Sequence, residues 1–165
     1  MQGKEIAIAS ANPVDLPSTG GTYALGLHLE TERQITVGAL GAWLFPEGLY
    51  LYVGSAWGPG GLRARVGRHL AGSQTLRWHI DYLRQQAHPV CLWLAEDTRL
   101  ECAWASWFAQ QASAKIIVPR FGASDCTCTS HLVHLGEHHQ VDFPFPHDIL
   151  SVSGSLAQSG RAGAF

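Results

Sequence analysis

Runs of apolar residues mark three strand-like segments early in the chain, at 21–29, 34–43 and 48–55. Short polar turns, several of them containing proline or glycine, separate these segments. Consecutive short strands joined by short turns are typical of antiparallel pairing. The pattern therefore predicts a meander of three antiparallel strands.

After the turn-forming residues 57–61, apolar positions recur at helical spacing. Leu62, Val66 and Leu70 fall on one face, which predicts a helix over 62–70. The later segments are predicted as a helix over 78–86, a buried strand over 90–94, an apolar helix over 100–111 and mostly loop beyond Pro119. This order indicates an α/β protein of the α+β type with one mainly antiparallel sheet.

The chain of 165 residues suits one domain, and 46% hydrophobic against 15% charged residues excludes disorder for its bulk. We expect an N-terminal extension over 1–19, a working domain over 20–148 and a disordered tail over 149–165. No apolar run approaches the roughly 20 residues of a membrane span. We therefore expect a soluble, cytoplasmic protein without a membrane partner.

The formal net charge of −2 argues against a protein that coats nucleic acid through bulk charge. Arginines nevertheless gather between positions 63 and 84, where Asp81 is the single acid. The guanidinium fork matches phosphate oxygens, so this window favours phosphate contact, although a solvated helix face is the alternative. The window contains Arg63, Arg65, Arg68, Arg77 and Arg84.

Alternation within the third strand places Leu49, Leu51 and Val53 on one face, and Tyr50 and Tyr52 on the other. We expect the first face to be core and the second to offer phenols. Tyrosine is also common in strands for packing reasons alone, so this pattern leaves a structural role open.

Two polar residues flank the apolar arc of the helix over 62–70. Arg65 and His69 are one turn apart, at i and i+4. At the rim of a buried face they could reach an anion across the edge of the sheet. The alternative is an arginine that buries only its aliphatic stem, beside a histidine at the rim.

Glu101 borders the apolar arc of the helix over 100–111, and a partly buried carboxylate needs a reason. Thr98 and Glu101 have the spacing of a capping box, in which the glutamate accepts a backbone N–H at the helix start. The other interpretation makes Glu101 a ligand for Mg²⁺ or Mn²⁺. The spacing leaves both open.

Four cysteines without a secretory pattern indicate reduced thiols or metal ligands. Cys126, Cys128 and His131 offer sulfur and imidazole, which suit zinc, and Cys102 or Cys91 could complete a tetrahedron. The spacing is not a common zinc pattern, and buried free cysteines are ordinary. The remaining histidines, His134, His138 and His139, are expected at the surface.

Several of these segments together resemble the motifs of the GIY-YIG nuclease superfamily, and more closely its DUF123 branch, over about residues 20–135. The glycine–tyrosine motifs, the helix with Arg65 and His69, and the helix with Glu101 occur in the expected order. The segments that carry the resemblance are Gly21-Thr-Tyr23, Tyr50-Leu-Tyr-Val-Gly-Ser-Ala56, Gly61-Leu-Arg-Ala-Arg-Val-Gly-Arg-His-Leu70, Trp78-His-Ile-Asp-Tyr-Leu83, Glu101-Cys-Ala103 and Phe121-Gly-Ala-Ser-Asp-Cys-Thr-Cys-Thr-Ser-His-Leu132.

The resemblance implies a three-stranded antiparallel sheet flanked by helices, and phosphodiester cleavage with one divalent metal. Glu101 would hold Mg²⁺ or Mn²⁺, Arg65 would stabilise charge on the phosphate, and Tyr23 would position or deprotonate water. Further expected catalytic residues are Tyr52, His69 and His79, and expected nucleic-acid contacts are Ser55, Arg63, Arg68 and Arg77.

We therefore expect a metal-dependent endonuclease acting on DNA, in repair or in the processing of branched or damaged DNA. RNA is an alternative substrate, and a repair enzyme is an expected partner. The competing hypothesis is a non-catalytic module that binds nucleic acid or a partner protein and contains zinc.

Overall fold

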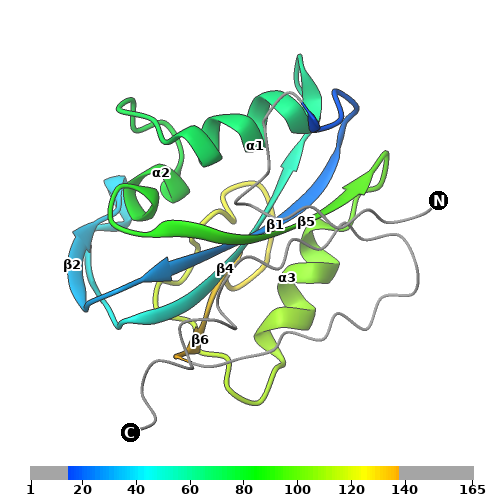
Figure 1. The fold of residues 1–165 in the computed structure, drawn as a ribbon. Coiled ribbons are helices and arrows are strands. Elements are labelled where there is room, and N and C mark those ends of the chain that lie inside the picture. Colours follow the sequence, from blue (N-terminus) through cyan, green and yellow to red (C-terminus); the bar gives the residue numbers. More distant parts are fainter. Residues whose placement is uncertain (1–14, 138–165) are drawn as a thin grey trace, which may run out of the picture.

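The computed structural model describes residues 15–137, which form a mixed α/β domain built on a four-stranded antiparallel sheet (Figure 1). The helices α1 and α2 cover one face of the sheet and α3 covers the other. The strands of this sheet are β1 (Gly21–Leu29), β4 (Gly48–Ala56), β5 (His88–Glu96) and β6 (Leu132–Gly136), in the order β5-β1-β4-β6, and the helices are α1 (Gly61–Ala71), α2 (His79–Arg84) and α3 (Glu101–Ala109).

The two central strands, β1 and β4, are buried on both faces because helices cover both sides of the sheet. Tyr50 and Tyr52 belong to the core cluster beneath α1 and α2. Leu51 and Val53 belong to the second cluster, which packs against α3. The alternation was predicted correctly, but the expectation of one core face was wrong, because the phenol face is core as well.

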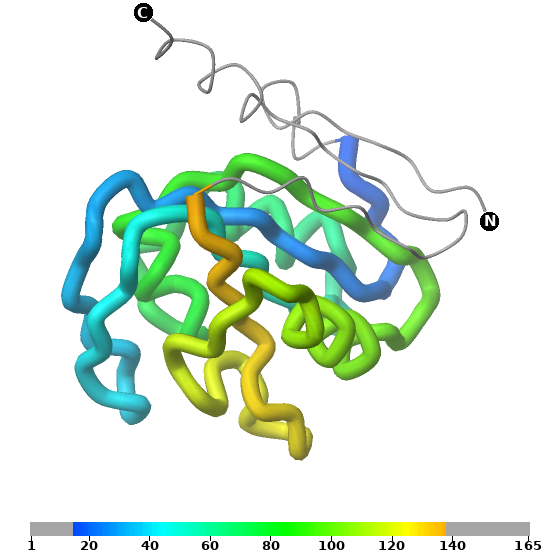
Figure 2. Tube along the Cα trace, turned by 90° about the horizontal axis from the view of Figure 1, so that it is seen from below, coloured from blue at the N-terminus to red at the C-terminus, as the bar shows by residue number. Residues whose placement is uncertain are grey.

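The segment expected as one strand over 34–43 is broken into two. The short strands β2 (Arg33–Thr36) and β3 (Ala42–Phe45) pair with each other as a separate two-stranded sheet. Between them a 3-10 turn begins at Gly38 (φ +45°) and is followed by Gly41 (φ +84°), and residues with side chains rarely adopt these positive φ angles. The hairpin projects to one side of the main sheet (Figure 2).

The expectation of three strands was also wrong because β5 and β6 both join the main sheet. The strand β6 lies within the segment expected to be loop, and four of its five residues pair with the β4 residues from Leu49 to Tyr52. His134, expected at the surface, is buried on β6. Its Nε2 lies 2.9 Å from the Glu47 carbonyl oxygen, and its ring packs against Tyr50. His138 and His139 lie outside the described residues.

Residues of the expected N-terminal extension support α1. Leu16 is fully buried in the core, and its carbonyl oxygen accepts a hydrogen bond from Arg63 Nε at 2.7 Å. The carbonyl oxygens of Thr19 and Pro17 accept the backbone N–H groups of Leu62 and Arg63, in the first turn of α1. These contacts satisfy donors that an α-helix leaves free at its start. Positions 1–14 and the expected tail over 149–165 lie outside the described residues.

Between residues 15 and 137, no helix combines the length and the apolar character needed to cross a bilayer.

Candidate functional site

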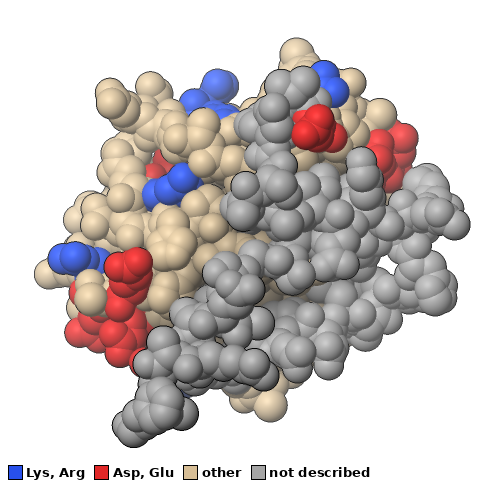
Figure 3. Space-filling view, in the orientation of Figure 1, with Lys and Arg blue, Asp and Glu red and all other residues tan. Residues whose placement is uncertain are grey.

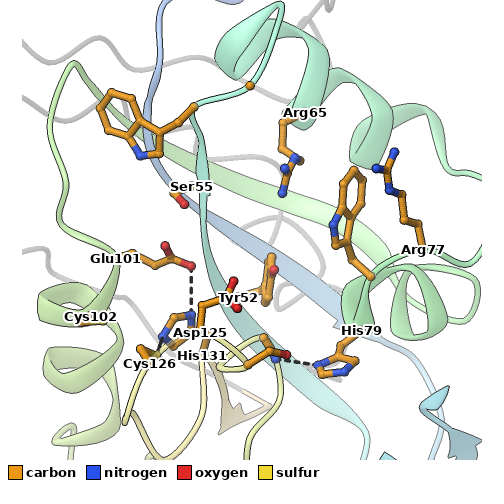
Figure 4. A pocket seen from close by; sticks show the side chains of 15 residues that line it. Tyr52, Ser55, Arg65, Arg77, His79, Glu101, Cys102, Asp125, Cys126 and His131 are labelled. Carbon is orange, nitrogen blue, oxygen red and sulfur yellow. Dashed lines mark hydrogen bonds and ion pairs between the residues drawn. The ribbon is translucent and has the colours of Figure 1, made fainter. Parts of the chain in front are cut away.

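A cavity of about 550 Å³ opens at the edge of β4 (Figure 4). Pairing between β4 and β6 ends at Tyr52, and the last such contact of the backbone is the Val53 N–H donating to the His131 carbonyl oxygen. Beyond this point side chains from both faces of the sheet can meet around the edge. The cavity is lined by Tyr52, Ser55, Trp57, Gly58, Arg65, Arg77, Trp78, His79, Glu101, Cys102, Gly122, Ser124, Asp125, Cys126 and His131.

This lining contains many of the residues singled out in the sequence, although they come from separate elements. The structure places outside it the predicted residues Tyr23, Arg63, Arg68, His69 and Cys128. It also places in the cavity four residues that the sequence analysis did not assign to the catalytic site, namely Trp57, Trp78, Asp125 and Cys102.

The two cavity arginines lie across from Glu101 (Figure 4). The guanidinium of Arg65 stacks on the ring of Trp78, with Cζ 4.0 Å from the ring centroid, and Arg77 lies 5.1 Å from the same centroid. Such stacking restricts the orientation of the guanidinium group, while its N–H groups stay available for hydrogen bonds. Trp78 therefore orients the positive side of the cavity.

Arg68 and Arg63 are engaged elsewhere. Arg68 Nη2 donates to Asp81 Oδ2 at 2.9 Å and to the Thr75 carbonyl oxygen at 2.8 Å. Arg63 donates to the carbonyl of Leu16. Both side chains stabilise the packing of α1, so the arginine window divides into structural residues and cavity residues.

Tyr23, His69 and Asp81 form a buried chain behind the cavity. Tyr23 Oη lies 2.8 Å from His69 Nε2, and His69 Nδ1 lies 3.9 Å from Asp81 Oδ1. Burial lowers the pKa of His69 to about 4, so the imidazole is neutral near pH 7. Burial and the neighbouring Tyr52 raise the pKa of Tyr23, which keeps its hydroxyl protonated.

Asp81 also fixes the start of α2. Its Oδ2 accepts the backbone N–H groups of Arg77 and Trp78 at 2.8 and 2.9 Å. Burial acts to raise the pKa of Asp81, but these hydrogen bonds and Arg68 outweigh it and the pKa is lowered. A carboxylate three residues into a helix that accepts N–H groups from before it is a recognisable cap signal. That signal, Asp81 after Trp78, was present in the sequence and was missed.

Gly54 makes room for Tyr23 on the neighbouring strand. The two residues are partners in the β1–β4 register, and a Cβ atom at Gly54 would lie 2.4 Å from Tyr23 Oη. Only glycine therefore lets this phenol cross the sheet surface and reach His69.

We expect Gly54→Ala to destabilise the protein by about 1–3 kcal/mol, because the added methyl group forces Tyr23 from its packed position. Urea unfolding monitored by circular dichroism measures this change. Gly58→Ala is the matched control, since a Cβ there meets nothing within 4 Å. Equal stability of the two variants would contradict the expectation.

Tyr52 is the phenol that lines the cavity. Burial, followed by the charge of Glu101, raises its pKa, whereas the charge of Arg65 acts in the opposite direction. Its ring packs edge-on against Phe121, and Gly122 approaches it so closely that a Cβ would lie 2.9 Å from the ring. The loop over 119–131 thus holds Tyr52 against the cavity wall.

His79 also faces the cavity from the start of α2. Its Nδ1 accepts the Gly122 backbone N–H at 2.9 Å, so the neutral ring carries its proton on Nε2. Burial lowers the pKa of His79. The ring therefore anchors the loop and presents a neutral donor.

Glu101 is the first residue of α3, and the capping-box interpretation is wrong. No side chain of Leu100 or Thr98 caps the helix, and Thr98 Oγ1 donates to the Glu96 carbonyl instead. The role falls to Thr22, whose Oγ1 accepts the Leu100 N–H at 2.9 Å. This partner lies 78 positions away and has no local sequence signal.

The carboxylate of Glu101 points toward the cavity, with Oε1 3.1 Å from His131 Nδ1. Burial acts to raise its pKa, but hydrogen bonds from His131 and Ser55 outweigh burial and lower it. Glu101 is therefore ionised at neutral pH.

Beside Glu101, four ligand-type side chains gather: Cys102, Cys126, Cys128 and His131. Their ligand atoms lie within 4.8 Å of one another. Cys91 is not part of this group, because it is buried on β5 against Gly26, and burial raises its pKa to about 12. Of the two cysteines left open by the sequence, Cys102 joins the cluster.

Comparison with known proteins identifies one family model, described as "Domain of unknown function DUF123", which matches residues 22–149. No curated protein and no solved structure matches the chain.

Proposed function

The chain belongs to the DUF123 family, and from its cavity we propose that it is a divalent-metal-dependent endonuclease of the GIY-YIG type that hydrolyses phosphodiester bonds in DNA. The observation that carries the proposal is the arrangement of opposite charges around a phenol: Arg65 and Arg77 lie across the cavity from Glu101, with Tyr52 in the wall. A phosphodiester with its cation needs both charges.

The cavity offers ligands of the type that Mg²⁺ and Mn²⁺ prefer. Glu101 is ionised, and the carboxylate of Asp125 and the hydroxyl of Ser55 line the same space. One or two carboxylates, completed by water and substrate phosphate, suffice for Mg²⁺. When bound, the ion would neutralise phosphate charge and lower the pKa of a bound water.

The chain's own residues bind the phosphate and orient the attacking water. Arg65, whose guanidinium stacks on the ring of Trp78, binds a phosphate oxygen. Negative charge that develops on the phosphate oxygens in the transition state strengthens this contact. Tyr52 touches the reacting centre and orients the attacking water through its hydroxyl. Burial raises the pKa of this phenol, so it acts as a donor unless Arg65 and a cation lower that pKa.

Tyr23 and His69 act as positioning residues behind Tyr52. The ring centroids of Tyr23 and Tyr52 are 6.2 Å apart, and those of Tyr52 and His69 are 6.3 Å apart. Nε2 of the neutral His69 accepts a hydrogen bond from the Tyr23 hydroxyl, and Asp81 faces Nδ1 of the same imidazole. This packing fixes the orientation of Tyr52.

We expect DNA to contact a small part of the surface rather than a broad basic face. On the face drawn in Figure 3 the basic side chains stand apart and acidic side chains gather at the lower left. The binding surface is instead the cavity rim, where Arg77 is exposed and Trp57 offers a ring. Arg99 stacks on that ring with Cζ 4.2 Å from the centroid, which supports it from one side.

We expect Trp57→Ala to weaken DNA binding about tenfold, because a nucleobase can stack on an exposed indole. The side chain is 38% exposed at the cavity rim. Fluorescence anisotropy with labelled single-stranded DNA measures the change. Leu44→Ala on the β2–β3 hairpin removes another exposed apolar side chain and should bind as the wild type does. Equal loss in both variants would contradict a specific role for Trp57.

The experiment that tests the proposal uses labelled nicked, flapped, branched, single-stranded and plain duplex DNA, together with RNA. Each substrate is incubated with the full chain in Mg²⁺, in Mn²⁺ or in EDTA. Cleavage of a DNA substrate in either metal and none in EDTA supports the proposal. Cleavage of RNA alone changes the substrate class. If the chain binds these substrates but cleaves none of them, the nuclease proposal is overturned in favour of a binding module. A repair enzyme would then be an expected partner of that module.

A further inference from the structure

We propose that Cys102, Cys126, Cys128 and His131 bind one zinc ion, and that this ion holds His131 in the orientation that positions Glu101. The zinc site goes beyond the proposed nuclease function and does not depend on it. Only the consequence for Glu101 rests on that function.

The donor set fits zinc better than the harder divalent ions. Three sulfurs and one imidazole nitrogen are the Cys₃His set of closed structural zinc sites. With Zn–S bonds of about 2.3 Å, tetrahedral geometry places the sulfurs roughly 3.8 Å apart. The four ligand atoms lie within 4.8 Å of one another, so a small inward movement of the side chains completes the site.

The backbone supports such a site from two independent elements. Cys102 lies in the first turn of α3, whereas Cys126 and Cys128 lie in the loop over 119–131. That loop is fixed near its ends, because Arg120 N–H donates to the Thr129 carbonyl and Ser130 Oγ donates to the Val118 carbonyl. A zinc ion would tie the loop to α3 across the edge of the sheet.

The two ring nitrogens of His131 face different partners. Nε2 lies 3.3 Å from Cys126 Sγ, inside the cluster, and Nδ1 lies 3.1 Å from Glu101 Oε1. A zinc-bound histidine characteristically presents its second N–H to a carboxylate, which fixes the tautomer and the ring orientation. Here the carboxylate is Glu101, so the zinc ion and the cavity share His131 as a link (Figure 4).

The alternative for these thiols is a disulfide. All three cysteines of the cluster are free, and an odd number cannot pair completely. A disulfide would leave one thiol beside His131 and would give the histidine no reason to point Nε2 at the sulfurs. Zinc uses all four side chains and explains the direction of the ring.

The first test is metal content. The full chain, purified under reducing conditions without chelator, is analysed for zinc by mass spectrometry, and the cobalt-substituted protein by absorption spectroscopy. We expect about one zinc per chain and the thiolate-to-cobalt bands of a tetrahedral site. Cys128→Ser should lose both, and Cys91→Ser should keep both, because Cys91 lies outside the cluster. Folded wild-type protein with neither zinc nor the cobalt bands overturns the site.

The second test concerns Glu101 and does not use cleavage. Mn²⁺ binding to the cavity is measured by electron paramagnetic resonance in the wild type, Cys128→Ser and Cys91→Ser. Cys128 does not line the cavity, so its loss acts through His131. We expect Cys128→Ser to bind Mn²⁺ roughly 10–100-fold more weakly than the wild type, and Cys91→Ser to bind it as the wild type does. Unchanged affinity after zinc loss overturns the coupling. Absent cleavage by the wild type would instead overturn the nuclease proposal and leave the zinc result standing.

Discussion

Glu101→Gln should lower metal-dependent cleavage by at least about 10²–10³-fold, because it removes the ionised carboxylate that would hold the cation. The substitution keeps the length of the side chain and an oxygen that can accept from His131 and Ser55. Packing around the start of α3 should therefore survive. Initial cleavage rates over a range of Mg²⁺ concentrations measure the effect, and excess metal should not restore the rate.

The matched control is Glu32→Gln, which neutralises an exposed glutamate before β2 and should cleave as the wild type does. Circular dichroism of both variants establishes that the fold is retained. A folded Glu101→Gln protein that still cleaves at the wild-type rate would remove Glu101 from the metal site and the cavity from the proposed mechanism.

Arg65→Ala is expected to have the second largest effect, a loss of about 10²–10³-fold in kcat, since removing one preorganised donor from a charged transition state costs this much. Arg65 lines the cavity and stacks on Trp78 at 4.0 Å. Arg65→Lys should recover only part of the loss, because an ammonium keeps the charge but lacks the planar fork.

Single-turnover kinetics and DNA binding in Ca²⁺ separate chemistry from affinity for this variant. We expect kcat to fall while the Kd for DNA rises less than tenfold, the pattern of an interaction made mainly in the transition state. Arg33→Ala removes an exposed arginine of β2 and should change neither quantity. A Kd change that accounts for the whole loss would make Arg65 a binding residue.

Local patterns in the sequence were sufficient for the elements whose partners are close or whose burial is regular. The strands predicted over 21–29 and 48–55 and the helix predicted over 62–70 match β1, β4 and α1 within a few residues. Each has an unbroken apolar pattern of its own period, which local analysis detects directly.

Other elements escaped prediction because long-range contacts define them. The strand β6 has five residues in a segment rich in turn formers, and its pairing with β4 is what makes it a strand. The break between β2 and β3 follows from the conformations of Gly38 and Gly41, which glycine permits but does not require.

For the candidate site, too, some features could be predicted from the sequence and others depend on long-range contacts. The periodic patterns marked Tyr52, Arg65 and Glu101 as polar residues on or beside apolar faces, and the motif resemblance implied their catalytic roles. Their convergence on one cavity depends on the β4–β6 pairing stopping at Tyr52, which leaves the edge of β4 open to both faces of the sheet beyond that point. No local pattern carries that information.

The sequence by itself determined the α+β class and the principal strands and helices, and it offered candidate side chains for phosphate and metal chemistry. Only the tertiary structure decided how they act together. It buried Tyr23 and His69 behind Tyr52, turned Arg68 toward Asp81, and chose Cys102 over Cys91. The physical reason is that periodicity reports which face of an element is buried, whereas distances between faces follow from the packing of the whole chain.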